Sequence, residues 1–371
     1  MGETVKKLIP LSIGLIILLP LLCTSWASDN DSPASAQPAA SKPARIATTP
    51  PPAPTKRTIV DLSGRTVIIP AVVNRVATSF PATNQMIYML GAGDKIVATV
   101  TSIAKNDIFV KIYPRLAKIS TPFEGAEINI ESLILAKPDV CFRLPTTDAA
   151  IKSIEQAGIP VIITPGFTDA ATLKDGLRLI AKVLGPKEEE VAKSFCVYYD
   201  NNIQKIGSVT SSIPKKQRPK LYYSANNPLN TEGKGTLPQF WAEMAGAVNV
   251  AAEAGIEGSF KNISAEDLVK WNPDVIVVRD FVNKGAILKD SRFSNISAVR
   301  NNRVYVNPKG IFVWCARSAE EALQILWTAK ILYPEKFPGL DIRQETKNFY
   351  KQFYHYTMSE EDLKETLEPG R

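Results

Sequence analysis

The chain contains one pattern twice, at Glu131–Val140 (ESLILAKPDV) and at Glu266–Val275 (EDLVKWNPDV). Both stretches have the form Glu-x-Leu-x4-Pro-Asp-Val, and each lies between a predicted helix and a predicted strand. Proline ends a helix and aspartate suits the turn that follows, so junctions of this kind are common in α/β proteins. The glutamate has the same position in both copies, which favours a true repeat over chance. We therefore infer two similar lobes, one from each half of the chain.

Short apolar runs and helical patterns alternate on both sides of the repeat. A predicted hairpin at 58–70 comes first. Further strands are predicted at 75–78, 96–100, 140–142, 161–164, 221–223, 275–278 and 303–306. Helices are predicted at 83–90, 130–136, 149–156, 170–184 and 318–332, and another begins at 237. This alternation predicts an α/β fold with two Rossmann-like lobes, whose mainly parallel sheets carry helices on both faces.

A longer helical pattern separates the two halves. Pro186 suits the first position of a helix, and the three glutamates that follow complement the helix dipole. Apolar side chains recur on one helical face, at Val191, Phe195, Tyr199, Ile203 and Ile206. We therefore predict one long bridging helix within residues 186–213. It would join an N-terminal lobe at 58–185 to a C-terminal lobe at 214–333, which a helical tail at 334–371 follows.

The N-terminus is typical of an exported protein. Two lysines precede the uncharged, leucine-rich run at 8–22, and a small-x-small pattern ends at Ala27, so we predict a signal peptide at 1–27. Lipidation at Cys23 and retention of the segment as a membrane anchor stay open. Residues 28–57, rich in proline, alanine and serine, predict a disordered tether. All three alternatives export the chain to the periplasm or cell surface, where the tether or an anchor would hold it near a membrane.

The composition excludes several classes of function. The 371 residues carry 44 Lys plus Arg and 37 Asp plus Glu, a net charge of +7 without a block of like charges, which argues against nucleic-acid binding. The only histidine, His355, excludes a metal site built from several imidazoles, and we expect it in a tail helix with a surface or structural role. Cys141, Cys196 and Cys315 would remain after signal cleavage. We expect buried thiols, and whether any of them pair stays open.

Four groups of motifs occur along the chain from Thr58 onward: Asp61–Pro70 with Asn74–Val76, Asn129–Leu133 with Lys137–Val140, Glu266 with Pro273–Val275, and the pattern from Trp314 to Pro334. Through them the chain resembles the substrate-binding proteins of bacterial ABC importers for iron-siderophore complexes and cobalamin. The resemblance implies two lobes around a ligand cleft, limited hinge motion, and a permease partner that is coupled to an ATPase. We expect the protein to be a monomer.

In the cobalamin-binding member of this family, one glutamate on each lobe docks into arginine pockets of the permease. The matching residues here are Glu131 and Glu266. Carboxylates on separate lobes could meet paired arginines bidentately and set the docking register. Each glutamate could equally stabilise the first turn of its own helix, and the two roles are compatible.

Ligands of open α/β sheets bind beyond the carboxyl ends of the strands. We predict ligand contacts from eight residues at such ends: Ser79, Phe80, Thr101, Arg143, Tyr223, Arg279, Trp314 and Arg317. The three arginines suit an anionic ligand, although any one of them could form a salt bridge instead. The aromatic side chains could wall a large chelate or lie in the core, and for Phe312 we expect the core.

These features predict the solute-binding component of an ABC importer, which captures an iron chelate or a cobalamin-type ligand. Molybdate, tungstate or a nickel or cobalt complex is the alternative ligand. A metal-dependent enzyme is the alternative from another class, although the chain lacks clustered metal ligands and a Gly-x-Ser-x-Gly motif. A secreted adhesion protein is a third. We expect no catalytic residues, no metal held by the protein and no cofactor besides the carried ligand.

Overall fold

The computed structural model describes residues 55–125 and 127–370. The predicted signal peptide and the predicted tether up to residue 54 lie outside this range. Within it, no helix has both the length and the apolar character needed to cross a membrane. The described chain has the predicted α/β fold with mainly parallel sheets.

The N-terminal lobe is built on a six-stranded sheet in the order β6-β5-β4-β3-β7-β8. Its strands are β3 (Val76–Thr78), β4 (Ile96–Val100), β5 (Ser120–Glu124), β6 (Glu127–Ile128), β7 (Val140–Arg143) and β8 (Val161–Ile163). Only β6 runs antiparallel to its neighbour. A separate antiparallel hairpin precedes the sheet, formed by β1 (Lys56–Val60) and β2 (Thr66–Pro70). The helices are α1 (Pro81–Met89), α2 (Thr101–Ala104), α3 (Asp107–Ile112), α4 (Ile130–Leu135), α5 (Asp148–Gln156) and α6 (Ala170–Leu184), with 3-10 turns η1 (Gly93–Lys95) and η2 (Pro114–Lys118).

The C-terminal lobe contains a four-stranded parallel sheet in the order β11-β9-β13-β14. Its strands are β9 (Lys220–Ser224), β11 (Val248–Asn249), β13 (Val275–Val278) and β14 (Val304–Val306). A short antiparallel pair, β10 (Asn230–Thr231) with β12 (Lys261–Asn262), lies apart from it. The helices are α8 (Leu237–Met244), α9 (Val250–Glu253), α10 (Ala265–Trp271), α11 (Phe281–Lys289) and α12 (Ser297–Arg300), with 3-10 turns η3 (Lys215–Gln217) and η4 (Ser291–Phe293).

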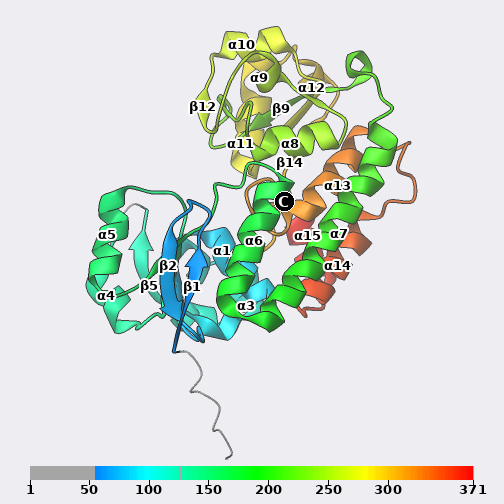
Figure 1. The fold of residues 1–371 in the computed structure, drawn as a ribbon. Coiled ribbons are helices and arrows are strands. Elements are labelled where there is room, and N and C mark those ends of the chain that lie inside the picture. Colours follow the sequence, from blue (N-terminus) through cyan, green and yellow to red (C-terminus); the bar gives the residue numbers. More distant parts are fainter. Residues whose placement is uncertain (1–54, 126, 371) are drawn as a thin grey trace, which may run out of the picture. The chain divides into compact units, whose positions relative to one another are not determined.

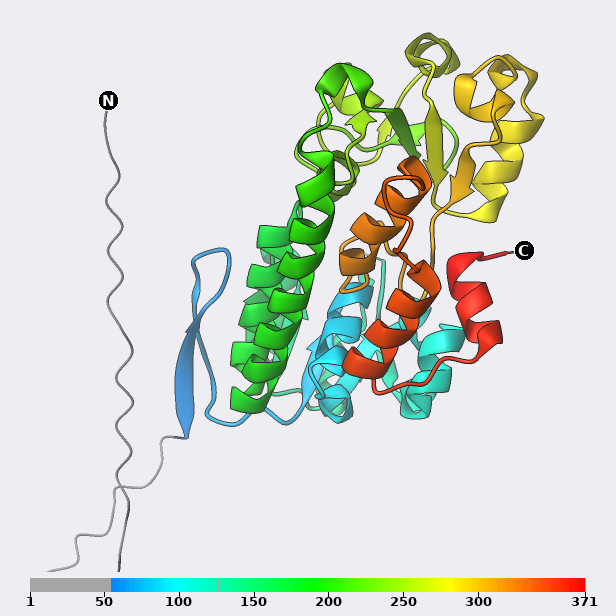
Figure 2. The same ribbon diagram turned by 90° about the vertical axis from the view of Figure 1, so that its right-hand side faces the viewer.

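One long helix, α7 (Pro186–Thr210), runs from the N-terminal lobe to the C-terminal lobe (Figures 1 and 2). It begins at a proline after Gly185, whose φ of 143° suits glycine, and it spans 25 residues. Helix α13 (Glu321–Leu332) packs along it, and Asn202 of α7 donates to the Ala322 carbonyl at 2.9 Å.

Two predictions in the last part of the chain need correction. Helix α13 begins at Glu321 and not at Ser318, because residues 318–320 form a turn in which the Glu321 N–H donates to the Ser318 carbonyl. His355 lies outside any helix, exposed, between α14 (Ile342–Phe353) and α15 (Glu360–Leu367). Its φ of 51° is left-handed, a conformation that cannot continue an α-helix.

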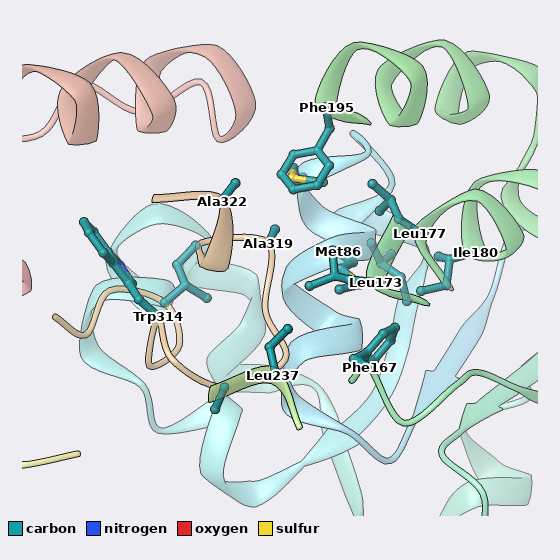
Figure 3. Close-up of a cluster of buried hydrophobic side chains, with 14 of the residues drawn as sticks. Met86, Phe167, Leu173, Leu177, Ile180, Phe195, Leu237, Trp314, Ala319 and Ala322 are labelled. Carbon is teal, nitrogen blue, oxygen red and sulfur yellow. The ribbon is translucent and has the colours of Figure 1, made fainter. Parts of the chain in front are cut away.

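A continuous hydrophobic core connects the lobes (Figure 3). Side chains from both lobes and from α7 contribute to it, including Met86, Phe167, Phe195, Leu237 and Trp314, all of them fully buried. The lobes therefore share packed apolar surface next to α7, which restricts any independent motion there.

The repeated sequence folds the same way in both lobes. The Asp139 carboxylate accepts from the Arg75 N–H at 2.9 Å, and its own N–H donates to the Arg75 carbonyl at 2.7 Å. Asp274 makes the same two bonds with Lys220, at 2.9 and 2.8 Å. Two residues before each aspartate, the φ angle is 46° in both lobes. The aspartate thus ties the end of one helix to the start of a neighbouring strand, and α4 and α10 are equivalent helices.

Candidate functional site

The carboxyl ends of the parallel strands face a junction between the lobes. Phe80 follows β3, and its ring centroid lies 6.4 Å from that of Phe312, which follows β14. Arg317 reaches the Gly166 carbonyl beyond β8. Asn106 donates to the Ile311 carbonyl at 2.9 Å. These contacts join the two lobes where the predicted ligand residues lie, as expected for parallel sheets.

Arg143 is the last residue of β7 and is only 7% exposed. Its Nε and Nη1 atoms are buried, and neither has a hydrogen-bond partner among the described residues. The guanidinium carbon lies 5.8 Å from the centroid of the Phe123 ring, and burial lowers the pKa of the group. The Arg143 carbonyl is fixed by Thr164, which donates through its N–H and its hydroxyl. Because a buried cation without partners is unfavourable, this site is well suited to an anion.

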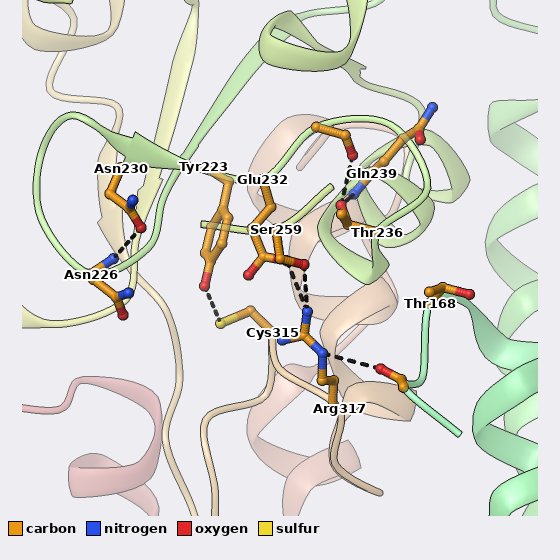
Figure 4. Close-up of polar contacts among 12 residues, drawn as sticks. Thr168, Tyr223, Asn226, Asn230, Glu232, Thr236, Gln239, Ser259, Cys315 and Arg317 are labelled. Atoms are coloured by element: carbon orange, nitrogen blue, oxygen red, sulfur yellow. Dashed lines mark hydrogen bonds and ion pairs between the residues drawn. The ribbon is translucent and has the colours of Figure 1, made fainter. Parts of the chain in front are cut away.

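Arg317 has the opposite surroundings (Figure 4). Its Nη2 atom donates to the Glu232 carboxylate at 3.0 Å and to the Ser259 hydroxyl at 2.8 Å, while Nε donates to the Gly166 carbonyl at 3.3 Å. The guanidinium also lies 5.6 Å from the centroid of the Phe260 ring. Glu232 is 1% exposed, so its charge is compensated locally by Arg317. Arg317 therefore fastens the lobes together and contributes little net positive charge to the junction.

Three non-glycine residues near this contact adopt left-handed backbone conformations. Phe167, Phe260 and Arg317 have φ values of 50°, 57° and 54°. Such conformations are unfavourable for residues with a Cβ and gather at clamps and switches. The Phe260 ring contacts the Arg317 guanidinium, and Phe167 directly follows Gly166, whose carbonyl accepts from Arg317.

Arg279 occupies an intermediate position at the end of β13. It is half-buried, and its Nη1 atom donates to the Asn226 side-chain oxygen at 3.1 Å. Since an amide oxygen is neutral, this bond leaves the charge of Arg279 available to attract an anion. Arg143 and Arg279 are thus the two predicted arginines whose charge is not matched by a bonded carboxylate.

The remaining predicted residues divide into two groups. Ser79 and Thr101 are half-buried at strand ends, as is Phe80, whose ring also stacks on Phe167 at 6.5 Å. Tyr223 and Trp314, in contrast, are 1% and 0% exposed and lie in the core. The Tyr223 hydroxyl lies 3.3 Å from the Cys315 sulfur, and burial raises the pKa of this tyrosine well above 10. These two side chains can support the wall of the junction from behind.

Phe312, which we expected in the core, packs against the core from its edge: it is half-buried, and its ring also contacts Phe80 across the junction. Glu232 and Ser259 were not among the residues predicted for the site. Glu232 follows Thr231 in a polar stretch without a distinctive pattern, and its partner Arg317 is 85 residues away. The described residues include no group of three or more His, Cys, Asp or Glu side chains placed to hold a metal ion.

Comparison with known proteins shows the family of this chain. Residues 76–310, more than half of the chain, match the family described as periplasmic binding protein. The molybdate-binding protein MolA of Haemophilus influenzae is 32% identical over 327 residues, which cover 80% of this chain and 91% of MolA. A vitamin B12-binding protein of Vibrio parahaemolyticus is 22% identical, over 63% of this chain and 80% of its own length.

The solved structure of MolA bound to molybdate superposes with a TM-score of 0.75 and 28% identity, covering 82% of this chain and 99% of MolA. These relatives are solute-binding proteins, in agreement with the prediction that the chain is a binding protein and not an enzyme. The chain belongs to the periplasmic binding protein family and is a solute-binding protein of an ABC importer.

Proposed function

We propose that the protein captures a small inorganic oxyanion of the molybdate or tungstate type at the junction of its lobes. The observation that carries this proposal is Arg143, whose buried Nε and Nη1 atoms have no partner among the described residues. Unpartnered N–H groups of a guanidinium are charged donors, and such donors suit the oxygens of an oxyanion. Arg279, on the opposite lobe, carries a second charge that no bonded carboxylate matches and that would attract the same anion.

The similarity to MolA supports the same ligand class, because MolA is named as a molybdate-binding protein and resembles this chain over most of both lengths. A dehydrated oxyanion has lost its hydrogen bonds to water, so rigid, charged donors of the protein must replace them. Thr164 donates hydrogen bonds to the Arg143 carbonyl and holds the backbone there, and the Phe123 ring lies beside the Arg143 guanidinium. Both features limit the freedom of the arginine before the ligand arrives.

An iron chelate or a cobalamin-type ligand, the first prediction from the sequence, is the second candidate. The similarity to a vitamin B12-binding protein favours it. A ligand of that size would have to separate the Phe80 and Phe312 rings, whose centroids lie 6.4 Å apart. The buried, unpartnered guanidinium therefore favours the smaller anion over the larger complex.

Calorimetric titration of the purified protein tests this order of candidates. Sodium molybdate, sodium tungstate, sodium sulfate, ferric citrate and cobalamin are compared for wild type, Arg143→Gln and the control Arg178→Gln. Arg178 is an exposed arginine of α6 that pairs with Asp175. We expect molybdate and tungstate to bind wild type and the control tightly and Arg143→Gln hardly at all. Tighter binding of ferric citrate or cobalamin, unaffected by Arg143→Gln, would overturn the oxyanion proposal.

We also propose that Glu131 and Glu266 dock the protein onto its permease. Both are exposed, and both occupy the second position of equivalent helices, α4 and α10. Asn129 and Ser264 cap these helices through their side chains, so the glutamates are not needed as caps. Two equivalent carboxylates on two lobes suit a partner that presents the same basic pocket twice. The protein would act as a monomer, kept near the membrane by its N-terminal segment.

A further inference from the structure

The Glu320 side chain lies at a buried meeting point of three parts of the chain. It is fully buried, and its carboxylate accepts from Gln85 Nε2 at 2.8 Å, from the Phe312 N–H at 2.9 Å and from the Ile311 N–H at 3.2 Å. The Tyr350 hydroxyl donates to it as well. Gln85 belongs to the N-terminal lobe, and Tyr350 belongs to α14 in the C-terminal tail. We call Glu320 and these four donors the Glu320 cage.

The cage leaves no space for another side chain. A Cβ atom on Gly310 would lie 1.8 Å from the Tyr350 hydroxyl oxygen and 2.2 Å from a Glu320 carboxylate oxygen. Gln85 is held from both ends, since its side-chain oxygen accepts from the Ala319 N–H at 2.9 Å. Ile311 is held in two ways as well, because its N–H also donates to the Tyr350 hydroxyl at 3.2 Å. The backbone at 310–312 is therefore fixed by side chains from distant parts of the sequence.

This backbone segment carries one wall of the ligand junction. The Phe312 N–H is bonded to Glu320, while the Phe312 ring faces Phe80 across the junction. Phe80 directly precedes α1, and Gln85 lies on α1 itself, so the cage also holds the helix that follows Phe80. The segments that carry the two rings of the wall are therefore both hydrogen-bonded to the Glu320 carboxylate.

The tail that supplies Tyr350 is firmly attached to the rest of the molecule. Phe349 and Phe353 of α14 pack against Phe195 of α7, with ring centroids 6.5 and 5.5 Å apart. Asp362 of α15 pairs with Lys111 of the N-terminal lobe at 2.6 Å. Tyr350 therefore reaches the cage from a rigid support.

We propose that Glu320 and Tyr350 are positioning residues of the ligand site, through which the C-terminal tail holds Phe312 in the wall of the junction. Neither residue would touch the ligand. This inference rests on the proposed function, because it assumes that the ligand lies at the junction of the lobes. The C-terminal tail, which we predicted from the sequence only as a helical segment at 334–371, would thus have a role in shaping the ligand site.

Three variants and a control test the proposal. Tyr350→Phe removes only the hydroxyl, Glu320→Ala removes all four acceptor contacts, and Glu320→Gln keeps an acceptor oxygen for Phe312. Tyr199→Phe is the control, because Tyr199 is a fully buried tyrosine of α7 whose hydroxyl has no partner among the described residues. Hydrogen exchange of the Ile311 and Phe312 amides reports on the cage, and titration with sodium molybdate reports on the site. Both are measured under conditions where circular dichroism shows every variant to be folded.

We expect exchange at Ile311 and Phe312 to rise at least about tenfold in Tyr350→Phe and further in Glu320→Ala. Molybdate affinity should fall about fivefold or more in both variants, less in Glu320→Gln, and not at all in Tyr199→Phe. Unchanged exchange in Tyr350→Phe, or raised exchange with unchanged affinity, would overturn the proposal. If wild type fails to bind molybdate, the proposed oxyanion function fails. The same affinity comparison is then made with whichever of ferric citrate or cobalamin binds, and the exchange results keep their meaning.

Discussion

Arg143 and Arg317 approach the same junction from opposite lobes, yet their surroundings differ in kind. Arg317 is bonded to a buried carboxylate, a hydroxyl and a carbonyl, whereas Arg143 has buried N–H groups without partners among the described residues. A buried charge that the protein itself neutralises contributes to structure. A buried charge that it leaves unmatched is a candidate for ligand binding. The contrast separates a residue that joins the lobes from one that we propose binds the ligand.

The comparison is most easily broken at Arg143. We expect Arg143→Gln to weaken molybdate binding by at least about 1,000-fold, because the anion loses its buried charged partner. The free energy of unfolding should stay the same or rise, since the substitution removes an unmatched buried charge. Calorimetric titration and urea denaturation measure the two effects. A large loss of stability would indicate that Arg143 has a structural partner and would end the contrast with Arg317.

Arg317 should respond in the opposite way. Arg317→Met leaves Glu232 buried without its ion pair, and we expect the free energy of unfolding to fall by about 3 kcal/mol. Adding Glu232→Gln should restore part of this loss, because the orphaned carboxylate is then gone. Urea denaturation of wild type, both single variants and the double variant gives the coupling energy. A coupling energy near zero would contradict the structural role of the pair.

Glu320 sharpens the comparison because it is a buried acid that is surrounded by hydrogen-bond donors. Burial raises the pKa of Glu320 from 4.5 to about 7, despite the hydrogen bonds from Tyr350, Phe312, Ile311 and Gln85. The folded state therefore binds this proton more tightly than the unfolded state does. The stability from this group is complete below pH 4.5 and is lost as the pH rises to about 7, a change of up to about 3 kcal/mol.

The difference in unfolding free energy between wild type and Glu320→Gln isolates this effect, because Gln cannot titrate. We expect the difference to shift against wild type between pH 5 and 7.5, as followed by urea denaturation at several pH values. A constant difference over that range would mean that Glu320 titrates with an ordinary pKa and that its cage is open to water.

The smallest expected effect concerns the glutamates of α4 and α10. Glu131→Ala combined with Glu266→Ala should change neither molybdate affinity nor stability, the two quantities that distinguish Arg143 from Arg317. Capture of the cognate permease in detergent should nevertheless be lost. The control combines Glu190→Ala with Glu365→Ala, which removes two exposed glutamates from other helices. Retained capture by the Glu131 and Glu266 variant would disprove the docking assignment.

Much of the fold could be predicted because its signals are local. The repeat, the alternation of strands and helices, and the proline and glutamates at the start of α7 each depend on residues close together in the sequence. The position of Arg143 followed from the same reasoning, because it directly ends a strand. The burial of individual side chains was harder to predict. Tyr223 and Trp314, which we expected to contact the ligand, lie in the core, whereas Phe312 contacts Phe80 at the junction.

The roles of the site residues could not be predicted, because they depend on partners far away in sequence. Arg143 and Arg317 look alike in the sequence, and only the arrival of Glu232 and Ser259 at Arg317 separates them. Glu320 belongs to a motif that resembles the family, but its cage draws on Gln85 and Tyr350, 235 and 30 residues away. Such contacts are set by tertiary packing and leave no periodic signal in the sequence.

Within residues 55–125 and 127–370, three buried cysteines could serve as chemical reporters for different parts of the structure. Burial raises the pKa of Cys141 and Cys315 to about 12 and 11, and that of Cys196 as well, so almost no thiolate exists in the folded protein. Because the thiolate is the reactive form, maleimides and mild oxidants should not react with these three thiols until the surrounding structure opens. Cys141 lies in β7, Cys196 in α7, and Cys315 in the segment behind the junction. The order in which they become labelled would trace the order in which the lobe, the bridge and the junction come apart.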